Sequence, residues 1–105
     1  MPYVLCELDD GLRPSEATVA VEDSDGRREY LRVERHYVKQ IDGRPCLPIG
    51  IIHGDNGGVL IELPHEADSG ANRLWVKVGS IVYSERERRE QAHDPVGSRN
   101  PSGPG

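Results

Sequence analysis

The sequence is poor in the large apolar side chains from which most small proteins build a core. Its 105 residues include no Phe, one Trp and one Met, so Val, Ile and Leu must fill the interior. No segment has the Ala-, Leu- and Lys-rich periodicity of a helical bundle, whereas 12 Gly and eight Pro are typical of a protein with many turns. We therefore expect a single all-β domain.

Long apolar runs are also missing. Nothing approaches the roughly 18 apolar residues of a membrane-spanning helix, and the first residues lack the basic and apolar regions of a secretory signal peptide. We therefore expect a cytoplasmic protein without a membrane partner. The two cysteines, Cys6 and Cys46, do not form a Cys-x-x-Cys pair, and in that compartment we expect them to be buried thiols.

Positive charge is scarce as well. There are 13 Lys and Arg against 18 Asp and Glu, which gives a net charge of −5. Residues 85–105 carry equal numbers of acids and bases, so the whole excess of acid lies before them. An acidic body binds phosphates poorly, and the charge therefore disfavours nucleic acid as a partner.

Short alternating apolar segments separated by turn formers follow one another along residues 1–84. About six to seven antiparallel strands of this length are typical of a small barrel or a sandwich, and for so short a chain we favour a partly open barrel of SH3-like architecture. No motif accompanies this likeness, so it implies no function. The strands are expected at 3–8, 17–23, 28–33, near 38, on both sides of the turn at 54–58, at 73–78 and at 81–83, with a short helical turn within 34–38.

The predicted centre of the fold is a hairpin from Leu47 to Leu63, because its two aliphatic runs flank the turn formers of residues 54–58. Leu60 and Glu62 are expected to point away from the core. The residues expected to point inward, here and in the other strands, are Val4, Cys6, Leu8, Val19, Val21, Leu31, Val33, Ile49, Ile51, Ile61, Leu74, Val76 and Val78. The segment from Pro64 to Asn72 is expected to be a loop too polar to bury.

The segments 28–33 and 73–78 resemble each other. Both combine basic, aromatic and aliphatic residues in the same order and end in Val, and both follow a turn containing Asp, Ser and Gly. A duplicated hairpin explains this similarity, and so does the small set of residue types that β-strands use.

The same two segments supply the candidate binding residues. If their aliphatic residues point inward, one basic–aromatic–basic triad points outward from each strand. Such a surface suits a protein partner or a second copy of the chain, although Arg stacking on aromatic rings also stabilises an exposed sheet without any ligand. The candidate partner-binding residues are Arg28, Tyr30, Arg32, Arg73, Trp75 and Lys77.

Catalytic and metal-binding patterns are not found. His53 and His65 lie at opposite ends of a predicted strand, roughly 13–17 Å apart, and neither they nor His36 and His93 have the spacing of a zinc site. No nucleophile motif is present, and the glycines of residues 54–58 have neither the Lys nor the following helix of a phosphate-binding loop. We therefore expect no catalytic residue, metal or cofactor.

Three functions remain open. The first, which we favour, is a non-enzymatic interaction module in residues 1–84 that binds a protein partner or itself through an outer sheet face or edge. The second is a small-barrel enzyme or metal-binding protein whose site is shared between subunits. The third is a single-stranded nucleic-acid binder that uses Tyr30 and Trp75. Residues 85–105, first charged and then rich in Pro, Gly and Ser, are expected to be a disordered tail.

Overall fold

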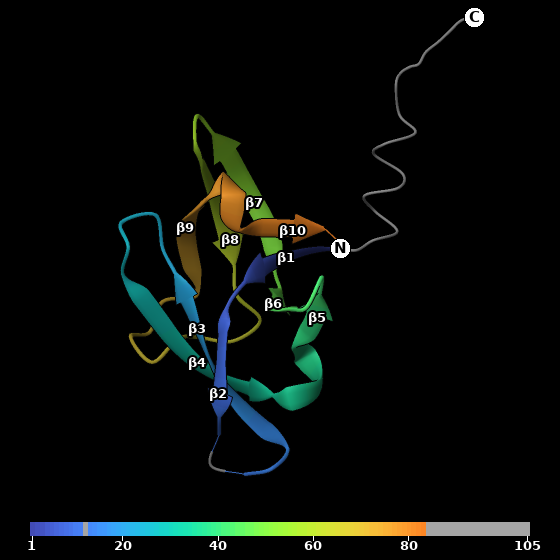
Figure 1. The fold of residues 1–105 in the computed structure, drawn as a ribbon. Coiled ribbons are helices and arrows are strands. Elements are labelled where there is room, and N and C mark those ends of the chain that lie inside the picture. Colours follow the sequence, from blue (N-terminus) through green and yellow to red (C-terminus); the bar gives the residue numbers. More distant parts are fainter. Residues whose placement is uncertain (12, 84–105) are drawn as a thin grey trace, which may run out of the picture.

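The computed structural model of the protein describes residues 1–11 and 13–83. These residues form ten strands in three small antiparallel sheets, none of which closes into a barrel within this part of the chain (Figure 1). The expected all-β class is confirmed, whereas the SH3-like barrel is not. The expected tail at 85–105 lies outside the described residues.

Each sheet combines short strands. The first has the order β10 (Ile81–Tyr83), β1 (Pro2–Leu5), β6 (Arg44–Pro48) and β5 (Lys39–Ile41). The second has the order β2 (Glu7–Asp10), β3 (Glu16–Glu22) and β4 (Arg28–Glu34). The third has the order β7 (Gly50–Asp55), β8 (Gly58–Glu62) and β9 (Arg73–Lys77).

Helical structure among the described residues is limited to two 3₁₀ turns. The first, η1 (Arg35–Tyr37), lies where a short helical turn is predicted, and the second is η2 (Val78–Ser80). Among residues 1–11 and 13–83, no helix has the length and apolar character needed to cross a membrane.

Left-handed turn residues close the hairpins. Asp42 and Gly43, with φ of 53° and 76°, connect β5 to β6, as the Asp-Gly pair predicts. In the β7–β8 hairpin, Asp55 pairs with Gly58, and Gly57 has φ of 90° between them. The predicted hairpin is confirmed, but its turn is tighter than the five residues expected.

The core lies where the three sheets meet. Each sheet contributes fully buried aliphatic side chains, since one face of each strand alternates inward. Most of the predicted inward residues are confirmed in this cluster, which contains Val4, Val19, Val21, Leu31, Val33, Leu47, Ile49, Ile61, Leu63, Ala67, Leu74 and Val76. Ala67 was not expected there, because it belongs to a loop predicted to be too polar to bury.

The predicted first strand is divided in two at Cys6. The Cys6 N–H donates to the Pro45 carbonyl at 3.1 Å, which keeps Cys6 beside the first sheet, and the chain then enters the second sheet as β2. Leu8 is paired with the buried Val19 but lies on an edge strand and is exposed, so its predicted burial in the core is wrong. Cys6 itself is half-buried against the core.

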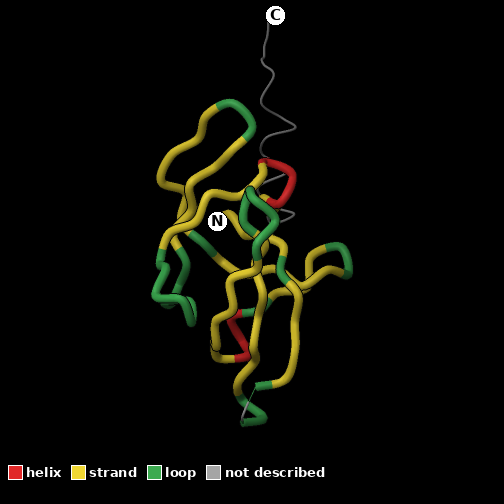
Figure 2. Tube along the Cα trace, turned by 90° about the vertical axis from the view of Figure 1, so that its left-hand side faces the viewer, coloured by secondary structure: helices red, strands yellow, loops and turns green. Residues whose placement is uncertain are grey.

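The β7–β8 hairpin is not the centre of the fold. It projects beyond the other two sheets (Figure 1 and Figure 2). Every residue of β7 is exposed. Ile51, predicted to be core, is 43% exposed, because β7 is an edge strand and no other element covers it there. A bulge at Ile52 leaves a second isoleucine exposed beside it.

The alternation of exposed and buried residues predicted for 73–78 holds from Arg73 to Lys77 and fails at Val78. Leu74 and Val76 are buried, and Glu62 on the neighbouring strand is exposed, as expected. Val78 is exposed, contrary to prediction, because β9 ends at Lys77 and Val78 begins η2.

Candidate functional site

The outward side of the β7–β8–β9 sheet carries the predicted triad of Arg73, Trp75 and Lys77. The ladder registers align its side chains in three rows across the strands. We call this surface the Trp75 face. Its rows are Gly50–Glu62–Arg73, His53–Leu60–Trp75 and Asp55–Gly58–Lys77.

Trp75 is held in position on this face by its neighbours. A Cβ atom on Gly58 would lie only 3.3 Å from the indole Cε3, so the absence of a side chain there lets the ring lie close to β8. The His53 ring meets the indole edge-on, with 6.1 Å between centroids. Even so, Trp75 is 40% exposed.

Charge on the Trp75 face is divided between its two sides. Arg73 and Lys77 lie on β9, and neither has an ion-pair partner among residues 1–11 and 13–83. Asp55 lies at the end of β7 and Glu62 on the middle strand, and they are also without a described ion pair. The face therefore presents a half-exposed aromatic between free charges of both signs.

The second predicted triad lies on a different sheet. Arg28 forms an ion pair with Glu7 at 3.1 Å, and Arg32 forms one with Asp68 at 3.2 Å. Tyr30 is 45% exposed on the same face of β4. The structure thus brings Arg28, Tyr30 and Arg32 together as a patch of their own, with both bases already paired to acids.

Sequence reasoning identified the β9 triad but missed the residues opposite it. His53, Leu60 and Gly58 join Trp75 only through the pairing of β7 with β8 and of β8 with β9. The tight turn before Gly58 carries the signal for this register, because hairpin turn length determines which residues face each other. The bulge at Ile52 has no comparable local signal.

The described histidines contact aromatic rings rather than one another. His36 and His65 both contact Tyr37, with centroid distances of 4.9 Å and 5.7 Å, whereas His53 contacts Trp75. In the described part of the chain, no group of three or more His, Cys, Asp or Glu is placed to hold a metal ion. His93 lies outside the described residues.

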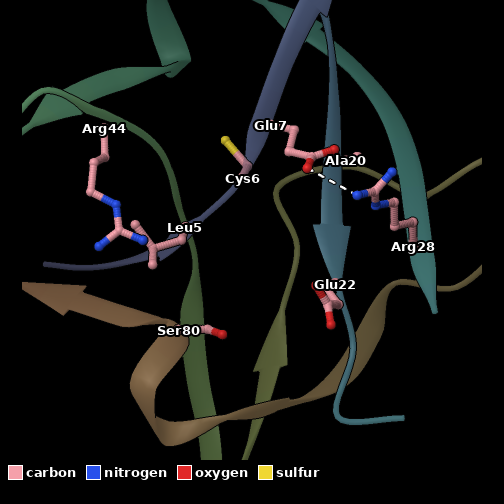
Figure 3. A pocket seen from close by; sticks show the side chains of 8 residues that line it. All are labelled: Leu5, Cys6, Glu7, Ala20, Glu22, Arg28, Arg44 and Ser80. Atoms are coloured by element: carbon pink, nitrogen blue, oxygen red, sulfur yellow. Dashed lines mark hydrogen bonds and ion pairs between the residues drawn. The ribbon is translucent and has the colours of Figure 1, made fainter. Parts of the chain in front are cut away.

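A cavity of about 250 Å³ lies between the first and second sheets (Figure 3). The Arg28–Glu7 ion pair forms one wall, and Cys6 and Arg44 contribute to the lining elsewhere. Burial, reinforced by the nearby Cys46, raises the pKa of Cys6 to about 12, and burial also raises the pKa of Cys46. Because the thiolate is the reactive form, neither cysteine is suited to act as a nucleophile at neutral pH.

The raised pKa of Cys6 predicts that its thiol is alkylated slowly in the folded protein. In the Cys46→Ala variant at pH 8, Cys6 should react with iodoacetamide at least about tenfold more slowly than in the same chain unfolded by urea, because burial, the larger cause of the raised pKa, remains in this variant and lowers the thiolate fraction. The same shift stabilises the folded state below pH 9, and that contribution is lost between pH 9 and 12. Equal alkylation rates in the folded and unfolded chains would contradict the burial of Cys6.

Comparison with known proteins gives no match to a family model, to a curated protein or to a solved structure. The site is therefore interpreted from its own chemistry alone.

Proposed function

We propose that this protein is a non-enzymatic interaction module on a small, partly open β scaffold, and that it binds a protein partner through the Trp75 face. The observation that carries the proposal is a half-exposed tryptophan in the middle row of the Trp75 face, held by Gly58 and His53. Tryptophan is enriched among the residues that dominate protein interfaces, and a side chain already held in place loses little freedom on binding.

The surroundings of Trp75 support a protein partner. Leu60 extends the apolar centre across the sheet, while Arg73 and Lys77 flank it and are free of described ion pairs. An apolar centre surrounded by a charged rim is the usual composition of a protein interface.

The alternative functions have less support. A single-strand nucleic-acid binder would stack bases on Tyr30 and Trp75, but these lie on separate sheets, and Arg28 and Arg32 are neutralised by acids of the chain itself. A shared catalytic or metal site would need histidines brought together from two subunits, but the described histidines each contact an aromatic ring of their own chain, His36 and His65 on Tyr37 and His53 on Trp75. The raised pKa of both cysteines disfavours them as nucleophiles in such a site.

Site-specific photocrosslinking tests the proposal. With p-benzoylphenylalanine at position 60, irradiation of cells that express the full chain should give a small number of discrete protein adducts. These adducts should disappear in the Trp75→Ala background, because the indole next to Leu60 anchors the partner.

The matched control places the same photoreactive residue at position 78. Val78 is also apolar and exposed, but it lies in η2, outside the Trp75 face. It should give no adduct that depends on Trp75. The proposal is wrong if position 60 gives no Trp75-dependent adduct, or if its only adducts contain nucleic acid.

A further inference from the structure

The charges of the Trp75 face have a specific order across the sheet. Asp55 on β7 and Lys77 on β9 occupy the two ends of one row, with Gly58 between them. In the middle row, His53 and Trp75 occupy the two ends, with Leu60 between them. The β7 side of the sheet therefore carries an acid and the β9 side carries a base, and neither has a described ion-pair partner in its own subunit. His53 and Trp75 already touch each other across Leu60, so together they form one aromatic surface at the middle of the face.

A second copy can meet this face about a two-fold axis parallel to the strands. Such an axis places β7 of one copy over β9 of the other and β8 over β8. Asp55 then faces Lys77 of the second copy, His53 faces its Trp75, and the two Leu60 side chains meet at the axis. The same contacts form twice, as in every isologous interface.

Glu62 is the one like-charge contact of this arrangement. Glu62 lies on the middle strand, so the Glu62 side chains of the two copies meet at the axis. In each subunit, Arg73 is the cross-strand neighbour of Glu62. A base directly opposite on the next strand lies about 5 Å away and offsets the repulsion. The Gly58 residues of the two copies also meet at the axis, and without side chains they do not obstruct the contact.

A second two-fold axis is possible, which also lies in the plane of the sheet but runs perpendicular to the strands. The charges of the two copies oppose each other less favourably about this axis. It places each strand over its own reversed copy, so Lys77 faces Arg73 twice and Asp55 faces only Gly50. Like charges placed opposite each other disfavour an interface, whereas opposite charges select its register.

We propose that the partner of the Trp75 face is a second copy of this chain, docked face to face about the axis parallel to the strands; this inference rests on the proposed function. Two sheets packed in this way keep their strand directions within about 30° and lie about 10 Å apart. Three strands of five or six residues present only about 15 by 17 Å in projection. The interface is therefore at the small end of the range, and the dimer should dissociate on dilution.

Sedimentation equilibrium of the full chain tests this arrangement through its charges. Lys77→Asp and Asp55→Lys should each weaken dimerisation about tenfold, because each creates two like-charge contacts. Combining both substitutions should restore dimerisation close to wild type, since the exchanged charges face each other again. All these positions are exposed, and circular dichroism checks that the variants remain folded.

The matched control is Tyr30→Ala, which removes an aromatic side chain of similar exposure from the β2–β3–β4 sheet. This variant should leave dimerisation unchanged. The proposed arrangement is overturned if Lys77→Asp strengthens dimerisation, which is the result expected for the perpendicular axis. It is also overturned if the chain stays monomeric up to millimolar concentration. In that case, photocrosslinked adducts of position 60 with another protein would still uphold the proposed function, whereas the lack of any adduct would refute both.

Discussion

Replacing Ile61 with alanine should lower the free energy of unfolding by about 2–5 kcal/mol. Ile61 is fully buried in the middle strand of the β7–β8–β9 sheet and belongs to the cluster where the three sheets meet. The lost methylene groups leave a cavity, because the neighbouring strands are held by their ladders and cannot close around it. In a domain of this size each kcal/mol corresponds to about 4–8 °C in Tm, so the loss should be visible by thermal as well as urea unfolding.

The matched control is Ile51→Ala. Ile51 pairs directly with Ile61 across the β7–β8 ladder and undergoes the same chemical change, but it is 43% exposed. We expect it to cost well under half as much, in line with substitutions outside a core. Equal losses at the two positions would show that β7 is covered in the folded chain and that the exposure described for Ile51 is wrong.

The Gly11→Ala variant should also be markedly less stable. Gly11 lies in the connection between β2 and β3, where its N–H donates to the Glu16 carbonyl at 3.2 Å. A Cβ atom there would lie 2.7 Å from both the carbonyl carbon and the oxygen of Glu16. These are backbone atoms that cannot rotate away, so the turn must open, and we expect a loss of about 1–3 kcal/mol in urea unfolding, as for other overpacked sites.

Gly79→Ala provides the comparison. Gly79 lies in η2, and a Cβ atom there would meet nothing within 4 Å. Its substitution should leave stability nearly unchanged or raise it by about 0.4–1 kcal/mol, because alanine restricts the unfolded chain. If Gly11→Ala were as stable as Gly79→Ala, the close approach of Gly11 to Glu16 would not exist in solution.

The hairpins could be predicted because their signals are local. The Asp42–Gly43 pair adopts the left-handed conformation that its sequence favours, and β3 pairs with β4 in the predicted antiparallel sense. The alternation within β9 also gave the outward positions of Arg73, Trp75 and Lys77 correctly. In each case the residues that determine the structure are close together in the sequence.

The errors at the three residues wrongly expected in the core share one cause. Alternation divides a strand into two faces, but it does not say what covers either face. Leu8, Ile51 and Val78 all follow the pattern of inward residues, yet two lie on edge strands and the third lies beyond a strand end. Whether a strand is central or at an edge depends on the pairing of sheets, to which distant segments contribute.

The candidate site shows the same division. The triad around Trp75 could be read from one strand, whereas the rows that join it to His53, Leu60 and Asp55 exist only because β8 pairs on both sides. The triad around Tyr30 looked equivalent in the sequence. The tertiary structure neutralises its bases with Glu7 and Asp68 and leaves those around Trp75 free of described ion pairs.

By itself, then, the sequence determined the all-β class, the hairpin turns and the outward direction of Trp75, because backbone preferences and the two-residue period of a strand act over a few residues. Only the tertiary structure decided that the strands form three sheets, that β7 is an exposed edge, and that Asp55 and Lys77 stand at opposite ends of one row. Those features depend on contacts between segments far apart in the chain. Which of these segments pair is governed by the packing of the whole core rather than by any local pattern.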